Sequence, residues 1–184
     1  MVRDEAVAAW IHAKVREFEG PLVLYALRMA GNPEDAQDAV QETFLRLCRQ
    51  ERSAIENCTA EWLFTVCRNC ALNIRQSGAR MHALKNEESI GDTKAELAGA
   101  KVEREESMSV VLTILKTLPE SEQEVIWLKF YEGFSYREIA EITNHSVNHV
   151  GVLLHLGLKK IRERLSVRDN LLTTARLKGR SDIS

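Results

Sequence analysis

The chain contains little of what several special classes of protein require. It has 4 cysteines, 3 prolines and 9 glycines in 184 residues, and 6% of its residues are aromatic. This composition excludes a disulfide-built scaffold and a collagen-like or low-complexity chain. The sequence also lacks a run of about 18 apolar residues, so we expect no transmembrane helix. The N-terminus has no apolar core of the signal-peptide type, which predicts a cytoplasmic protein with reduced thiols.

Motifs for catalysis are missing as well. The sequence contains no P-loop, no HExxH motif and no sign of a Ser-His-Asp arrangement, so nothing supports an enzyme or a cofactor site. A single C-x-x-C pair, Cys67 and Cys70, has Cys48 and Cys58 upstream, and a second C-x-x-C that would make a zinc site convincing is missing. We interpret the pair as core residues and predict no metal, while a thiol-based redox or metal protein stays an alternative.

Charge of neither sign dominates the whole chain, since the net charge is −2. The charges are segregated, however. Residues 34–61 carry seven acids and three bases, 62–85 carry four bases and no acid, 86–106 carry seven acids and three bases, and 159–180 carry eight bases and two acids. Blocks of alternating sign indicate surfaces for different partners, although solvated helix faces would give the same pattern.

Helical patterns cover nearly the whole chain, and no segment alternates like a strand. We therefore predict an all-α protein of two small helical domains joined by a flexible acidic linker. The first domain is expected over residues 1–85, the linker over 86–106, the second domain over 107–168, and a basic tail over 169–184 whose order is left open. In the first domain, the apolar segment 22–30 should pack against a helix over 33–50 that Asn32 caps, and a further helix should cover 60–76. The buried stripe of the helix over 33–50 should consist of Ala36, Val40, Thr43, Phe44 and Leu47.

The second domain carries the sharper local signals. Ser135 and Glu138 have the spacing of a capping box that opens a short helix, residues 143–145 form a turn, and Ser146 caps a last helix that reaches about residue 165. The inward side of this last helix should consist of Val150, Leu154, Leu158, Ile161 and Leu165. A helix, a three-residue turn and a second helix make the unit that places its second helix in the major groove of DNA.

Three stretches in this order resemble one family. GNPEDAQDAVQETFLRL (31–47) is similar to the polymerase-binding helix of bacterial sigma factors, EWLFTVCRNCALNIR (61–75) to the segment that handles melted promoter DNA, and LPESEQEVIWLKFYEGFSYREIAEITNHSVNHV (118–150) to the promoter-reading helix-turn-helix domain. The order and length resemble the extracytoplasmic-function (ECF) sigma factors of the sigma-70 family.

The resemblance implies a set of partners and a role for each domain. The partners would be the clamp and flap surfaces of core RNA polymerase, promoter DNA and an anti-sigma factor, and the linker would thread near the polymerase active-site cleft. The face toward core polymerase would consist of Asp35, Asp38, Gln41, Glu42 and Arg46. The −10 element would be melted and bound by Arg68, Asn69, Asn73, Arg75 and Arg80. Asn73 stands where the family often has aspartate, which puts the base preference of that pocket in doubt.

The −35 element would be read by the helix that Ser146 caps. Its candidate base contacts are Ser146, Asn148, His149 and His155, and its candidate phosphate contacts are Arg137, Lys159 and Lys160. The sequence VGVLLHLGL (150–158) departs from the family, because it is apolar where many members have basic residues. Leu153 and Leu156 would then contact another protein or pack within the domain, or the helix would lean on DNA shape and the basic tail. The alternative function is a helix-turn-helix regulator of DNA or protein without sigma activity.

Overall fold

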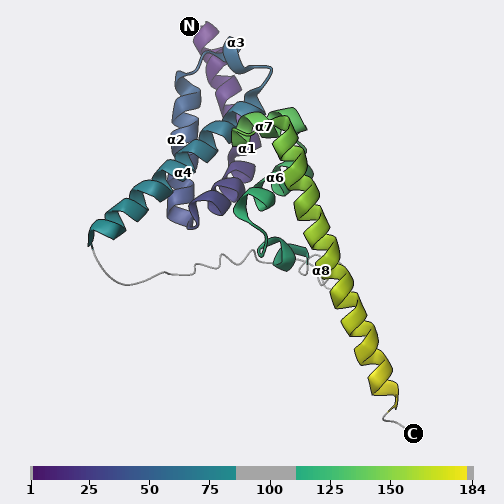
Figure 1. The fold of residues 1–184 in the computed structure, drawn as a ribbon. Coiled ribbons are helices and arrows are strands. Elements are labelled where there is room, and N and C mark those ends of the chain that lie inside the picture. The colour runs from purple at the N-terminus through teal and green to yellow at the C-terminus, as the bar shows by residue number, and fades with distance from the viewer. Residues whose placement is uncertain (1, 86–110, 182–184) are drawn as a thin grey trace. The chain divides into compact units, whose positions relative to one another are not determined.

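The computed structural model describes residues 2–85 and 111–181, and the side chains of 5–78 and 111–167 within them. These residues divide into two compact units (Figure 1). The first contains helices α1 to α4, and the second contains α6, α8 and most of α7. Every regular element in the described ranges is a helix, which confirms the predicted all-α class.

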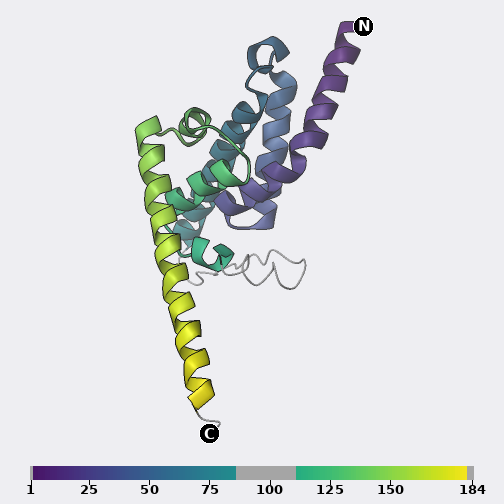
Figure 2. The same cartoon turned by 90° about the vertical axis from the view of Figure 1, so that its right-hand side faces the viewer.

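The first unit is built from three helices that pack against one another. Helix α1 spans Val2–Ala30, α2 spans Pro33–Arg49 and α4 spans Thr59–Lys85. Each of the three contacts the other two, as Figures 1 and 2 show from perpendicular directions. Their shared core contains Leu22 and Tyr25 of α1, Leu47 of α2 and Phe64 of α4, all 0–1% exposed. The rings of Tyr25 and Phe64 meet with centroids 5.1 Å apart, which couples α1 to α4.

The start of α2 follows from three adjacent residues. Asn32 adopts an extended conformation and its Oδ1 accepts a hydrogen bond from the backbone N–H of Asp35 at 2.9 Å, which confirms the predicted cap. Pro33 occupies the first turn, where no intrahelical bond needs its missing N–H. Gly31 has φ +89°, a conformation that glycine adopts without strain, and it ends the preceding helix.

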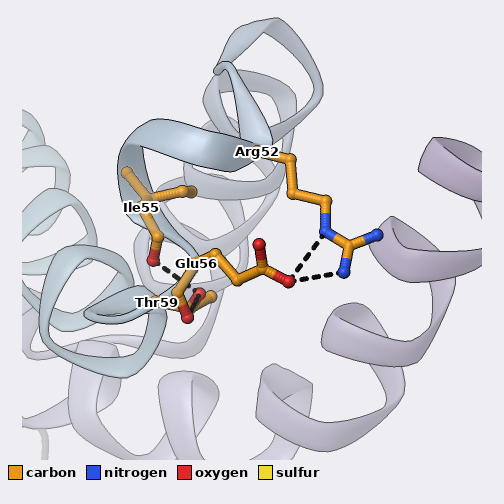
Figure 3. Close-up of polar contacts among 4 residues, drawn as sticks. All are labelled: Arg52, Ile55, Glu56 and Thr59. Atoms are coloured by element: carbon orange, nitrogen blue, oxygen red, sulfur yellow. Dashed lines mark hydrogen bonds and ion pairs between the residues drawn. The ribbon is translucent and has the colours of Figure 1, made fainter.

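A short helix, α3 (Arg52–Ile55), fills the connection between α2 and α4. Figure 3 shows its polar contacts: the Arg52 guanidinium pairs with Oε1 of Glu56 at 2.5 Å, and the Thr59 hydroxyl donates to the carbonyl of Ile55 at 2.8 Å. The same guanidinium lies 5.5 Å from the ring of Trp10, so it also contacts α1. Ile55 is 3% exposed, and it anchors the connection in the core of the unit.

The second unit contains α6 (Glu120–Phe130), α7 (Tyr136–Thr143) and α8 (Val147–Ser181). The predicted capping box is confirmed, because the Ser135 N–H donates to Oε2 of Glu138 at 2.7 Å and the Glu138 N–H donates to Oγ of Ser135 at 3.3 Å. Between α7 and α8, Asn144 has φ +55° and the His145 N–H donates to the carbonyl of Ala140 at 3.0 Å. This is the helix, short turn and helix that the sequence predicts.

Helix α8 packs on α6 through a glycine and an ion pair. A Cβ atom built on Gly157 would lie 2.6 Å from Cδ1 of Ile126, so the two helices approach closely at this point. One turn away, Nζ of Lys160 lies 2.5 Å from Oε1 of Glu122, whose side chain is 5% exposed. Val150, Leu154 and Ile161 line the buried side of α8, as predicted.

Several helices extend beyond their predicted bounds. Helix α1 begins at Val2, far ahead of the apolar segment at 22–30, α4 ends at Lys85 instead of near 76, and α8 ends at Ser181 instead of near 165. No proline follows position 119, so no residue of that type interrupts the end of α8. The predicted acidic linker, residues 86–106, lies outside the described residues, as do the last three residues of the predicted tail.

Candidate functional site

Helix α2 presents one polar face opposite its buried side. Ala36, Val40 and Leu47 are buried, whereas Asp38 and Gln41 are exposed. Nε of Arg46 donates to Oε1 of Glu42 at 2.8 Å, so these two predicted residues form a pair on the surface, and the hydrogen bond raises the pKa of the arginine. Asp35 also serves the helix cap, because Nδ2 of Asn32 donates to its Oδ2 at 2.6 Å. The structure thus brings all five predicted residues onto the exposed side of one helix.

The α2 face also holds a residue that the sequence analysis missed. Leu45 is 52% exposed and follows Asp38 by seven residues and Gln41 by four, so it lies on the same helical face as both. Leu45 gives an otherwise polar face an apolar group, and binding surfaces combine an apolar centre with a polar rim. The signal was in the sequence, since Leu45 falls off the stripe formed by Val40, Thr43 and Leu47.

Helix α4 carries the residues predicted to bind the −10 element. Asn69 and Asn73 are exposed one turn apart, and exposed Gln76, which was not predicted, continues their line. Arg68 and Arg75 are two turns apart on a neighbouring line, Arg68 half-buried and Arg75 exposed. Arg80 belongs to α4, but its side chain lies outside the described residues. The α4 surface therefore has an amide line and an arginine line.

The buried side of α4 explains the C-x-x-C pair. Cys67 and Cys70 are 0% and 5% exposed, and Sγ of Cys67 donates to the carbonyl of Leu22 at 3.9 Å. Burial raises the pKa of the Cys67 thiol to about 12 and also raises that of Cys70, so both stay protonated at neutral pH. This confirms their interpretation as core residues. Within the described part of the chain, no group of three or more His, Cys, Asp and Glu side chains could hold a metal ion.

The outward side of α8 carries a single stripe. Asn148, Val152, His155 and Lys159 are all exposed and follow one another at intervals of four, three and four residues, which places them on one line along the helix. His149 lies beside that line and contacts the ring of His145, with centroids 4.8 Å apart. Ser146 caps the helix, because its Oγ accepts a hydrogen bond from the N–H of His149 at 3.2 Å.

The two lysines predicted to contact phosphate have different surroundings in the structure. Arg137 and Lys159 are exposed, and Lys159 has a carboxylate, that of Glu163, only at 4.0 Å. Lys160 instead points toward α6 and pairs with buried Glu122. The sequence does not reveal this pairing, because the two residues are 38 positions apart.

The two leucines of the apolar segment in α8 have different positions. Leu153 is 7% exposed and packs within the protein, whereas Leu156 is 40% exposed. Leu158, predicted to face inward, is 36% exposed. Val152, which has no predicted role, is 52% exposed. The outer surface of this helix is thus apolar through Val152 and Leu156.

Comparison with known proteins assigns both units. The model of the family "Sigma-70 region 2" matches residues 15–81, and that of "Sigma-70, region 4" matches residues 109–161. The chain is 28% identical over 159 residues to the ECF RNA polymerase sigma factor SigL of Mycobacterium tuberculosis, covering 85% of this chain and 89% of that one. It is also 28% identical over 167 residues to SigE, an ECF sigma factor of Mycolicibacterium smegmatis, covering 89% of this chain and 64% of that one.

Two solved structures share the fold. The sigma factor RpoE of Bartonella quintana, solved in complex with the anti-sigma factor NepR, superposes with a TM-score of 0.57 at 20% identity over 85% of this chain and 96% of that chain. CnrH, solved with the cytosolic domain of CnrY, gives a TM-score of 0.55 at 20% identity over 85% of this chain and 88% of that chain. Over residues 2–85 and 111–181, no helix has both the length and the apolar character of a transmembrane span.

The two matched regions occur in the order that the sequence motifs predict, and together they cover most of the chain. The face of α2 lies in the first region, and the helix-turn-helix with the stripe of α8 lies in the second. The chain belongs to the sigma-70 family, in its ECF group, and is an alternative sigma factor that directs transcription initiation.

Proposed function

We propose that this sigma factor works through three separate helical surfaces and performs no catalysis itself. The exposed face of α2 binds the clamp of core RNA polymerase, the amide and arginine lines of α4 bind the melted −10 element, and the outward stripe of α8 reads the −35 element. The polymerase supplies the chemistry. The setting is the cytoplasm, where core polymerase and promoter DNA are found.

The observation that carries this proposal is the composition of the α2 face. Asp38, Gln41 and Leu45 share one exposed face, and the core of the unit is made by other side chains of the same helix. Acidic and amide groups around an exposed leucine suit a partner surface that is basic at its edge and apolar at its centre. A helix-turn-helix regulator that needs no polymerase contact would have no use for such a face, so this feature favours the sigma role over the alternative.

The chemistry of α4 supports its role with single-stranded DNA. Asparagine and glutamine amides both donate and accept hydrogen bonds, so Asn69, Asn73 and Gln76 suit the edges of unpaired bases. Arg68 and Arg75 supply positive charges that can contact the phosphates of the DNA backbone. Residues 62–85 contain no acid that would repel phosphate.

Regulation follows from the same surfaces. One of the two solved relatives is held by an anti-sigma factor, and by analogy we propose that such a factor controls this chain by covering its polymerase-binding face. Charge on the α2 face would then determine both interactions.

Capture of bacterial core polymerase by the tagged full-length chain tests the proposal. Binding should fall by at least about tenfold, the equivalent of 1.4 kcal/mol, in the double variant Gln41→Ala/Glu42→Lys and in Leu45→Ala. Glu5→Lys is the matched control, because Glu5 is exposed on α1 outside the matched region and should leave binding unchanged. Equal capture of all the variants would contradict the role of the α2 face, and no capture of the folded wild-type chain would contradict polymerase binding itself.

A further inference from the structure

The outward side of α8 forms an open apolar hollow in place of a basic recognition surface. The hollow has a volume of about 470 Å³ and is lined by Tyr136, Val147, Asn148, Gly151, Val152, His155 and Leu156. Four of its apolar side chains, those of Tyr136, Val147, Val152 and Leu156, are each 40–52% exposed. Apolar side chains that gather on one exposed face mark a binding surface.

The absence of a side chain at Gly151 leaves space in the hollow beside Tyr136. A Cβ atom at this position would lie 3.8 Å from Cε2 of Tyr136, in ordinary van der Waals contact with the ring. Because Gly151 has no such atom, the ring of Tyr136 and the backbone at Gly151 both line the hollow, and we call these two residues its floor. A methyl group can approach this floor closely, whereas a longer side chain at position 151 would fill it.

The charges around the hollow are those of a surface that faces phosphate. From Val147 to Arg162 helix α8 contains no acid, and it has Lys159 and Arg162 exposed at its far end, where Glu163 follows and lies 4.0 Å from Lys159. Arg137 is exposed next to Tyr136, at the start of α7. The carboxylate of nearby Glu138 is engaged by the backbone of Ser135. Cations on both sides of an apolar centre suit duplex DNA, with phosphates at the rim and base edges at the centre.

The methyl group that DNA presents in the major groove is the C5-methyl of thymine. We propose that Val152 and Leu156 read the −35 element by packing on thymine methyl groups over the Tyr136–Gly151 floor. Asn148, at the edge of the hollow, reads an adjacent adenine through its amide, which matches the N6 donor and N7 acceptor of that base. This inference rests on the proposed function of α8. It assigns specificity for A·T pairs to a helix whose exposed stripe has no arginine that could bind guanine.

Replacement of thymine by deoxyuridine tests this contact, because it removes the methyl group and leaves base pairing unchanged. Holoenzyme made from core polymerase and the full-length chain first selects its −35 element from random duplexes. Affinity is then measured for the selected duplex with each thymine of the element replaced in turn. The loss of one buried methyl should weaken binding by about fourfold, which corresponds to about 0.8 kcal/mol.

Variants assign the effect to the hollow. Val152→Ala should reduce the preference for thymine over deoxyuridine, and the double variant Val152→Ser/Leu156→Ser should abolish it, because both apolar packing partners have then gone. Asn148→Ala should lose its preference for adenine and keep the sensitivity to methyl groups. Val167→Ala is the matched control, since Val167 is an exposed valine on the same helix and outside the hollow, and it should behave as wild type.

Each failure has its own meaning. If a −35 element is selected but wild type binds the deoxyuridine and thymine duplexes equally at every position, the thymine inference is wrong and the sigma role stands. If, in addition, an anti-sigma protein binds the wild-type chain and does not bind Val152→Ala, the hollow is a protein-binding site instead. If no holoenzyme forms, the proposed binding to core polymerase fails; if holoenzyme forms but selects no element, the proposed function of α8 fails with the inference.

Discussion

Nζ of Lys160 lies 2.5 Å from Oε1 of Glu122 and ties the long C-terminal helix to α6. The Glu122 carboxylate is almost fully buried, and its Oε2 has no hydrogen-bond partner among the described residues. A buried charge that depends on one cation makes this lysine a structural residue of the helix-turn-helix unit.

Lys160→Met should therefore destabilise the second unit by about 1–3 kcal/mol, because it leaves the Glu122 carboxylate buried without a partner. The double variant Glu122→Gln/Lys160→Met should recover at least half of that loss. Urea unfolding followed by Trp127 fluorescence measures the effect, with Trp10→Phe and Trp62→Phe in the background so that Trp127 is the single tryptophan. The matched control is Lys159→Met, whose partner is exposed and which should change stability by less than about 0.5 kcal/mol. Equal effects of the two methionine variants would contradict a structural role for Lys160.

The four thiols should differ in their reactivity toward a thiol reagent in the native protein. Cys67 and Cys70 are buried, and burial raises the pKa of the Cys67 thiol to about 12, whereas Cys48 and Cys58 are exposed. A thiol reagent at neutral pH should label only Cys48 and Cys58 quickly, and all four in denaturant, as peptide mass spectrometry would show. Because the folded pKa of Cys67 is raised, ionisation of this thiol disfavours the folded state as pH rises above the thiol's usual value. Rapid native labelling of Cys67 would show that the C-x-x-C pair is reactive and would reopen the redox alternative.

The capping box at the start of α7 should make stability depend on pH. The hydrogen bonds from Ser135 lower the pKa of the Glu138 carboxyl, so its contribution is present above the usual carboxyl pKa and is lost as pH falls through the folded value. Glu138→Ala should cost about 0.5–1 kcal/mol at neutral pH, and the difference from wild type should shrink below about pH 4. Ser135→Ala should have a similar effect at neutral pH. A difference that stays constant with pH would mean that the cap does not act through the charge of Glu138.

Two glycines of α8 should respond differently to alanine. Alanine favours a helix over glycine by about 1 kcal/mol, and a Cβ at Gly151 meets only an ordinary contact, so Gly151→Ala should stabilise the second unit. At Gly157 the same Cβ would meet Cδ1 of Ile126 at 2.6 Å, and the isoleucine must shift. Gly157→Ala should be at least about 1 kcal/mol less favourable than Gly151→Ala in the same urea assay. Equal gains would show that α6 and α8 do not approach as closely as the structure has them.

The sequence predicted local structure well, because capping residues and apolar spacing act over a few positions. Asn32, Ser135 and Ser146 each cap as expected, and the buried stripes of α2 and α8 are largely correct. Helix ends were predicted less well. The end of α8 was placed about 16 residues too early, since polar sequence without proline reads equally well as a tail.

Contacts between distant residues were beyond the reach of such patterns. Nothing near Lys160 indicates that it would face a buried glutamate 38 positions away instead of phosphate. Leu153 is buried and Leu156 is exposed because of the way α8 is rotated about its axis against its neighbours. The spacing of apolar residues in the sequence does not determine this rotation. Leu45 and Val152 were missed because attention to charged residues overlooks an exposed apolar one.

If this chain is a sigma factor, it gives core polymerase a promoter preference. Transcription in vitro from a library of fragments of the source genome, with core polymerase of the same bacterium, measures that preference. Discrete transcript starts preceded by shared −10 and −35 elements are expected when the chain is added, none of them with core polymerase alone, and none with the Gln41→Ala/Glu42→Lys variant. An unchanged pattern of starts, from a chain that does bind core polymerase, would show that it does not act as a sigma factor.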